Sequence, residues 1–133
     1  MSRENVAIVR RAIDAFASAG TSAPIQGLVA EDVEWRPAFE VAGGTTYVGR
    51  EGSERFMKEW TEDFDDWTLE TEDLLDAGEA VVARLRQTAR GKGSGASVEL
   101  RFGAVFRLRD ARIARIELYM TVAEALEAVG LRE

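Results

Sequence analysis

The sequence has no cysteine and no histidine among its 133 residues, and only two prolines. The absence of cysteine excludes disulfides, thiolate nucleophiles and zinc–thiolate sites. The absence of histidine excludes Ser–His and Cys–His catalytic pairs, imidazole metal ligands and the side chain that most often moves protons near neutral pH. Acid–base chemistry in this chain would therefore need a carboxylate.

Positive charge is also scarce, because 17 Lys and Arg stand against 24 Asp and Glu, a formal net charge of −7. This balance argues against a nucleic-acid partner, since phosphate binding requires clustered positive charge. No apolar run approaches the roughly 18 residues of a membrane-spanning helix, and the charged start of the chain lacks the pattern of a signal peptide. Apolar residues make up 46%. We therefore expect one folded domain over residues 1–133, soluble and cytoplasmic, without membrane contact, metal or cofactor.

The first half of the chain has the periodicity of helices interrupted by one short strand. Residues 5–19 carry apolar side chains at helical spacing, and a short helix is expected around residues 25–29 after Pro24. Residues 33–36 alternate apolar with polar and end at Pro37, which predicts an edge strand. A further helix is expected over residues 51–64, because Phe56, Trp60 and Phe64 lie four residues apart.

The second half changes to the period of strands. Residues 68–75, 80–90, 98–108 and 113–120 are four strand candidates separated by turn signals. The glycine-rich segment 91–95 lacks the strand–loop–helix context of a phosphate-binding loop and is interpreted as a hairpin turn. The acidic run 62–66 lacks the spacing of a calcium loop. Thr121 is the predicted cap of a final helix over residues 123–129, so the pattern favours an α+β fold with a mainly antiparallel sheet.

Four segments carry a resemblance to a known family: Asp32-Val33-Glu34-Trp35, the segment 47–52 (YVGREG), the segment 112–119 (RIARIELY) and the segment 125–131 (ALEAVGL). In this order the chain resembles the SnoaL-like branch of the NTF2-like superfamily. The resemblance implies an NTF2-like (cystatin-like) cone, in which a curved, mainly antiparallel sheet wraps around three helices and a short helix ends the chain. It also implies that the open end of the cone holds a small, largely apolar ligand. The fold hosts several enzymes and plain binding modules, so it does not by itself assign an activity.

Ketosteroid isomerases of this fold use a carboxylate base and an oxyanion hole built from a phenol and a protonated acid. The resemblance places the phenol position on Ile13, the base on Arg36 or Trp35, and the protonated acid on Ala104. None of these side chains has the required group, so this activity is excluded.

Two other enzyme classes of the fold remain alternatives. Polyketide cyclases would need a carboxylate in the pocket, but the most evident carboxylates occupy turns or polar strand faces. Epoxide hydrolases use an Asp–Arg–Asp arrangement, for which Arg36 or Arg84 offers the arginine while no two aspartates share its face. A protein-interaction module is the third hypothesis. The favoured one is a protein that binds a small, mostly apolar molecule, with no catalytic residue assigned.

The candidate ligand-binding residues come from the alternation of two strands, from the helix expected over residues 51–64, and from the first strand with the loop that follows it. Such sites are mainly apolar with a few polar groups, and we expect polar contact from Arg36, Tyr47 and Gln87. The aromatic members are equally typical of an ordinary core. The full set is Trp35, Arg36, Phe39, Tyr47, Phe56, Trp60, Gln87, Leu100, Phe102, Ala104, Ile116, Leu118 and Met120.

The opposite face of the sheet is the expected interface of a homodimer, in keeping with the resemblance. The residues directed there mix both signs of charge with valine and tyrosine, which fits a self-complementary surface. Arg84, Arg86 and Arg90 are interpreted as part of a solvated or dimer-facing surface rather than as an anion site, with Arg84 and Arg86 meeting Glu99 across the strands. The interface set is Glu99, Arg101, Val105, Arg107, Arg115, Glu117 and Tyr119.

Overall fold

The computed structural model describes residues 2–19, 27–37 and 46–131. Its elements are α1 (Ser2–Ala19), β1 (Val29–Pro37), β2 (Tyr47–Val48), α2 (Gly49–Thr61), β3 (Phe64–Asp76), β4 (Ala80–Gly91), β5 (Ser97–Arg109), β6 (Arg112–Tyr119) and α3 (Val122–Ala128). The strands form one six-stranded sheet in the order β2-β1-β6-β5-β4-β3. Every pair is antiparallel except β1 with β6. The α+β class with a mainly antiparallel sheet is therefore confirmed.

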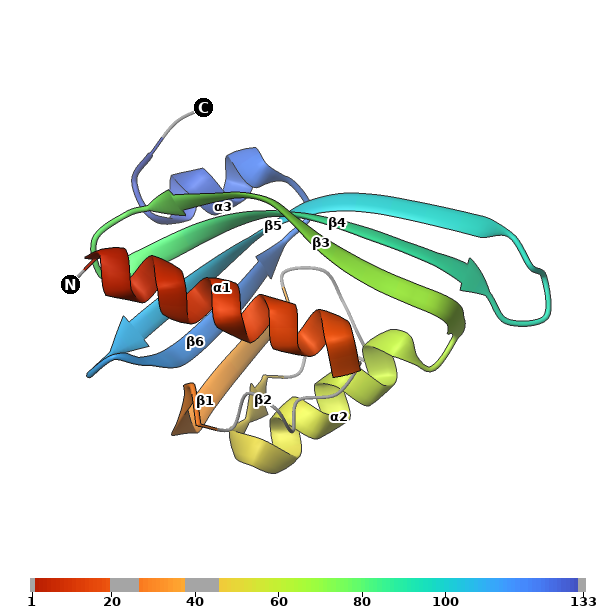
Figure 1. Cartoon of the computed structure of the whole chain (residues 1–133), viewed down its shortest axis with the longest axis horizontal. Coiled ribbons are helices and arrows are strands. Elements are labelled where there is room, and N and C mark those ends of the chain that lie inside the picture. Colours follow the sequence, from red (N-terminus) through yellow and green to blue (C-terminus); the bar gives the residue numbers. More distant parts are fainter. Residues whose placement is uncertain (1, 20–26, 38–45, 132–133) are drawn as a thin grey trace.

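The curved sheet holds the helices on both of its faces (Figure 1). Helix α1 packs against β3 and β4, and α2 packs against β1 and β2. The short helix α3 packs against β5 and its neighbours β4 and β6 on the opposite face. The two faces are called inner (toward α1 and α2) and outer (toward α3) below. No helix among the described residues is long and apolar enough to cross a membrane.

The alternation of β4 and β5 separates two apolar clusters. Inward-facing Leu85, Phe102 and Phe106 belong to the main core, in which α1 also buries its apolar stripe. Outward-facing Val82 and Val105 join a smaller cluster under α3. The strand register explains this division, because Val82 pairs with Val105 and Leu85 with Phe102 across β4 and β5.

Three expected boundaries differ from the structure. Strand β1 is not an edge strand, because the two-residue β2 pairs with Glu34 and Trp35 on its outer side. Helix α2 ends at Thr61, and Phe64 opens β3 by pairing with Gly91, so strand pairing overrides the helical spacing. Of the helix expected at residues 25–29, residues 25 and 26 lie outside the described residues and Val29 begins β1.

Helix α3 lies very close to β5 at Gly103. A Cβ atom at this position would approach the Cβ of Ala125 to 2.8 Å and the carbonyl oxygen of Thr121 to 3.0 Å. The predicted cap is confirmed, because the Thr121 hydroxyl accepts a hydrogen bond from the backbone N–H of Glu124. At the other end of α3, the Arg107 guanidinium donates to the Ala128 carbonyl at 3.2 Å. The helix is thus fixed at both ends over a glycine.

We expect the substitution Gly103→Ala to lower the free energy of unfolding by about 1–3 kcal/mol, because the added methyl group overpacks this contact. Urea denaturation followed by circular dichroism measures the loss. Gly27→Ala is the matched control, since a Cβ there meets nothing within 4 Å. Equal stability of the two variants would show that α3 does not depend on the close approach at Gly103.

Candidate functional site

The inner face encloses a small apolar cavity of about 20 Å³. A void of this size is about large enough for one water molecule, and apolar voids stay dry. The cavity lies between α1, α2 and the five strands β1, β3, β4, β5 and β6, in the middle of the main core. Its lining consists of Ile13, Phe16, Trp35, Met57, Trp60, Leu69, Leu85, Phe106, Ile116 and Leu118.

Aromatic rings in mutual contact form one side of this interior. Trp35 stacks on Phe56 with ring centroids 4.8 Å apart, and Phe16 meets Trp35 edge-on at 5.2 Å. Trp60 contacts both Phe56 and Phe102 at 5.4 and 5.6 Å. Such ring pairs stabilise the fold by more than the burial of their apolar surface alone. The spacing of Phe56 and Trp60 on α2 correctly predicted that both face inward, so this wall is at once core and candidate ligand surface.

The indole of Trp35 is fixed by a hydrogen-bond chain within the protein. Its Nε1 donates to the hydroxyl of Ser53 at 2.7 Å, and that hydroxyl donates to the carbonyl oxygen of Gly49 at 2.8 Å. Ser53 is fully buried on α2. Both donors are satisfied internally, so the polar edge of Trp35 has no group to offer a ligand.

Tyr47 forms a phenol–carboxylate pair with Glu59, a residue that the sequence did not single out. The buried hydroxyl donates to Oε2 of Glu59 on α2, and the guanidinium of Arg55 lies 4.7 Å from the centre of the phenol ring. Burial raises the pKa of Tyr47, and the hydrogen bond to Glu59 raises it further. Arg55 and Glu59 are four residues apart and so share one side of α2. The spacing of Arg55 and Glu59 was the only sequence signal at this place, and it is also typical of a surface ion pair.

Gln87 is the buried amide of the inner face. Only 2% of the residue is exposed, and its Oε1 accepts a hydrogen bond from Nε1 of Trp67 at 3.0 Å. Its cross-strand neighbours are Leu69 on β3 and Leu100 on β5. Gln87 does not itself line the cavity, but it lies beside Leu69, which does.

Most of the candidate ligand residues are brought together in the main core. Trp60 and Leu100 are partly buried at its edge, and Phe39 lies outside the described residues. Ligand contact itself stays a prediction for all of them. Those buried on the inner face are Trp35, Tyr47, Phe56, Gln87, Phe102, Ala104, Ile116 and Leu118.

Two candidates do not face the interior. Arg36 pairs with Glu34 at 3.2 Å and leaves 49% of its side chain exposed, because strand alternation directs it away from its neighbour Trp35. Met120 is 48% exposed, because β6 ends at Tyr119 and Met120 belongs to the bend before α3. The inward direction expected for Met120 is therefore wrong, and Arg36, from which we expected a polar contact with the ligand, points away from the cavity.

Ion pairs between strands and within β5 occupy the outer face of β3, β4 and β5. Arg86 contacts Glu70 at 2.8 Å and Glu99 at 3.2 Å, and Arg101 contacts Glu99 at 2.9 Å. The hydrogen bond from Arg86 is the main cause of the lowered pKa of Glu99. The pairing of Arg86 with Glu99 was predicted from the sequence. It favours a mutually neutralised surface rather than an anion site.

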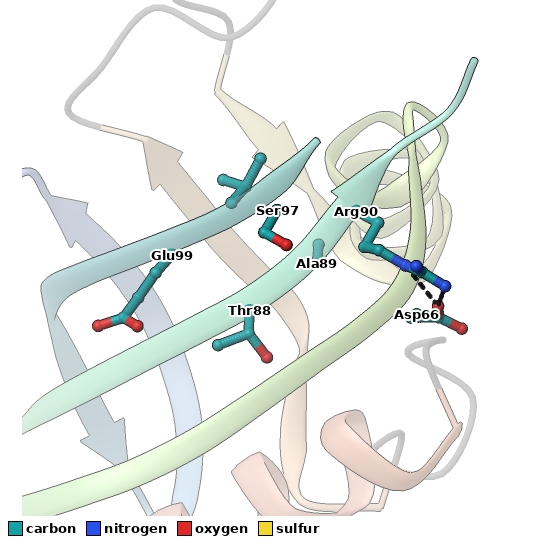
Figure 2. Close-up of a pocket in the computed structure, with 7 residues that line it drawn as sticks. Asp66, Thr88, Ala89, Arg90, Ser97 and Glu99 are labelled. Carbon is teal, nitrogen blue, oxygen red and sulfur yellow. Dashed lines mark hydrogen bonds and ion pairs between the residues drawn. The ribbon is translucent and has the colours of Figure 1, made fainter. Parts of the chain in front are cut away.

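A hollow of about 400 Å³, lined mostly by polar side chains, lies where β4 ends and β5 begins (Figure 2). Its charged side chains already have partners, because Arg90 pairs with Asp66 at 3.1 Å and Glu99 pairs with Arg86. The adjoining segment 91–95 is a hairpin turn, as predicted, closed by the N–H of Gly91 donating to Ala96. Among the described residues, no three acidic side chains gather where they could hold a metal ion.

Nearer α3, the outer face buries Glu117. The carboxylate accepts hydrogen bonds from Arg107 at 2.8 Å and from the hydroxyl of Tyr119 at 2.9 Å, with Arg115 at 3.4 Å. Burial alone would raise the pKa of Glu117, but these three donors together outweigh it and lower the pKa. Val105 is fully buried under α3. Part of the surface expected to form a dimer is therefore already covered by the chain itself.

The family model of the SnoaL-like domain matches residues 9–116, and the chain belongs to this family. No curated protein matches the sequence significantly. Solved structures share the fold across nearly the whole chain. An NTF2-like protein of unknown function from Burkholderia pseudomallei is 22% identical, with a TM-score of 0.75 over 96% of this chain and 98% of that one.

Two other proteins with this fold are named after an enzyme or after the fold of one. A putative SnoaL-like polyketide cyclase from Jannaschia is 17% identical, with a TM-score of 0.75 over 99% of this chain and 95% of that one. A protein with a ketosteroid isomerase-like fold from Catenulispora acidiphila, in complex with trimethylamine, is 20% identical, with a TM-score of 0.68 over 90% and 92%. At these identities the likeness shows the fold, and the sequence-based fold prediction is confirmed.

The raised pKa values predict how the two tyrosines titrate. Burial is the largest cause for both Tyr47 and Tyr119, so the native protein should form less phenolate near pH 10 than the unfolded chain does. The raised pKa values stabilise the fold below about pH 10, the pKa of tyrosine in the unfolded chain. This contribution is lost as the pH rises through the pKa values of the two tyrosines in the folded protein. Spectrophotometric titration measures both. We expect Glu59→Gln to lower only the pKa of Tyr47, with Tyr119 as internal control; an unchanged titration would contradict the pair.

Proposed function

We propose that this protein binds a small, mostly apolar molecule between α1, α2 and the inner face of the sheet. The observation that supports the proposal is the cavity lining, which is made only of aliphatic, aromatic and thioether side chains. The nearby polar groups of Trp35 and Tyr47 are paired with other side chains. A ligand without charge fits such surroundings, since an unpaired charge would lose its hydration there.

Binding requires the interior to rearrange, because the cavity of about 20 Å³ is far smaller than an aromatic molecule. The residues best suited to move are Met57, whose thioether chain is flexible, and Trp60 and Leu69, which are only partly buried. All three line the cavity on the side of α2 and β3. A ligand would take the place of these side chains against the same apolar neighbours.

An enzyme is the second candidate, and the Tyr47–Glu59 pair is the observation that favours it. A carboxylate held against a buried phenol is the described arrangement closest to an acid–base pair. The ketosteroid isomerase positions remain empty of suitable groups, since Ile13 lines the cavity, Arg36 faces outward and Ala104 is buried. If a carbonyl substrate of the cyclase type is turned over, Glu59→Gln should abolish turnover while leaving binding in place.

Changes at Leu69 test the binding proposal with ethylbenzene as the probe. Leu69→Ala enlarges the cavity and should bind ethylbenzene several-fold more tightly, at a stability loss of about 1–3 kcal/mol. Leu69→Trp fills the cavity and should weaken binding about tenfold or more. Isothermal titration or chemical-shift changes measure the affinities.

Leu74→Ala is the matched control for these variants. Leu74 is also a partly buried leucine of β3 packed on the core, but it does not line the cavity. Its loss should destabilise the protein without changing the affinity for ethylbenzene. Equal affinities of Leu69→Trp and Leu74→Ala would place the binding site outside this interior.

The proposal includes a homodimer formed through the part of the outer face that α3 leaves open. Its support is the mixture of both charges on β4 and β5, where Glu99 and Arg101 are exposed and adjacent. A surface that carries both signs can pair with a copy of itself under two-fold symmetry. A cytoplasmic location stays a prediction from the sequence.

Sedimentation at tens of micromolar protein tests the homodimer. We expect a dimer for the native chain and a shift toward monomer for Arg101→Glu, because the reversed charge faces like charges across the interface. Glu62→Arg, at the exposed end of α2, is the control and should remain dimeric. A native chain that sediments as a monomer would refute the interface.

A further inference from the structure

Gln87 stands out among the inner-face residues as a neutral polar side chain in apolar surroundings. It follows Leu85 on β4 by two residues, and it is flanked across the strands by Leu69 and Leu100. Only 2% of it is exposed to solvent. Burying an amide costs free energy unless its donors and acceptor are used, so the partners of each of its atoms matter.

The orientation of this amide is determined by Trp67. The oxygen and nitrogen of a glutamine amide are hard to tell apart by shape, and the hydrogen-bond network normally assigns them. Here the partner is an indole N–H, which can only donate, 3.0 Å from the amide. The atom facing Trp67 must therefore be the oxygen, and the amino group Nε2 points away from Trp67.

Trp67 also connects this amide to the cavity wall. Its ring contacts Trp60 with centroids 6.0 Å apart, and both Trp60 and Leu69 line the cavity. Among the described residues, the structure records one side-chain hydrogen bond of Gln87, which its oxygen accepts from Trp67. Nε2 is not one of the fully enclosed polar atoms that lack a partner, which are Oγ1 of Thr71 and Nε of Arg86, so this amino group stays within reach of a small molecule. A donor that is within reach and has no acceptor among these residues is available to a bound molecule.

We infer that Gln87 is a specificity residue, which donates a hydrogen bond from Nε2 to an acceptor on the bound molecule, while Trp67 positions the amide for this contact. The inference rests on the proposed function and names the ligand class: compact apolar molecules carrying one carbonyl, ether or similar acceptor. A bound molecule that covers Nε2 removes this donor from water, so an analogue that lacks the acceptor leaves the donor unpaired and binds less tightly. Alcohols and amines gain nothing from their own donors at this position.

Acetophenone and α-methylstyrene form the test pair, because they have nearly the same shape and differ only in C=O against C=CH₂. Affinities are measured by titration for the native chain, Gln87→Leu, Trp67→Phe and the double variant, which removes both partners of the hydrogen bond together. We expect Gln87→Leu to weaken acetophenone by about 5- to 10-fold, as the loss of one neutral hydrogen bond implies, and to change α-methylstyrene less than about 2-fold. Trp67→Phe keeps an aromatic ring but frees the amide to turn over, so the ratio of the two affinities should fall.

A direct readout is the side-chain NH₂ signal of Gln87 in a nitrogen-15 spectrum, assigned by its absence in Gln87→Leu. We expect acetophenone, and not α-methylstyrene, to shift this signal. The double variant controls for folding, since it leaves neither the indole donor nor the amide unpaired. An unchanged affinity ratio in Gln87→Leu would overturn the inference and leave the proposed binding function standing. If neither compound binds the native chain, the proposed function fails and the inference fails with it.

Discussion

The pleat of β4 and β5 is the constraint on which the rest of the molecule depends. These two strands run side by side in unbroken register from the pair Ala80–Arg107 to the pair Arg90–Ser97. Every side chain on them is therefore assigned to one face or the other. A shift of one residue would move Phe102 and Phe106 to the outer face and Arg101 and Arg107 into the core. The aromatic interior and the charged exterior are thus two consequences of one register.

The outer face shows how the same register accommodates a third helix. Where the outward residues are small or apolar, at Val82, Gly103 and Val105, α3 lies on the sheet. Where they are charged, at Arg86 and Glu99, the strands are left open and neutralise one another. Edge strand β3 adds acidic side chains to this open part, and exposed charge on an edge disfavours pairing with another copy of the same edge.

Much of the fold could be predicted, because segments with a long and regular apolar period keep the expected secondary structure when the chain packs. The strand expected at residues 98–108 is β5 at Ser97–Arg109, and the helix expected at residues 123–129 is α3 at Val122–Ala128. Strand β2 was missed because two residues carry no period, and its pairing moved β1 from the edge to the interior of the sheet. Phe64 was misplaced because its spacing fits a helix while Gly91 offers it a strand partner.

The candidate site was less predictable than the fold, since it depends on side-chain pairs between distant segments. Alternation identified Phe102, Ala104, Ile116 and Leu118 as inward-facing, and they are. The same rule applied to β1 would have excluded Arg36, because its neighbour Trp35 already faces inward. Glu59 could not be singled out, because its partner Tyr47 lies twelve residues earlier and nothing in the spacing connects the two.

Three aromatic donors explain why the interior is so poor in available polar groups. The indole of Trp35 donates to Ser53, the phenol of Tyr47 to Glu59, and the indole of Trp67 to Gln87. The Ser53 hydroxyl donates its own hydrogen bond to the carbonyl oxygen of Gly49, and a carboxylate at Glu59 has no hydrogen to donate. The amide of Gln87 differs, since it accepts through oxygen while keeping two hydrogens on nitrogen. Among the three acceptors Ser53, Glu59 and Gln87, only Gln87 can accept the hydrogen bond of its aromatic partner and still donate one to a molecule that enters the interior.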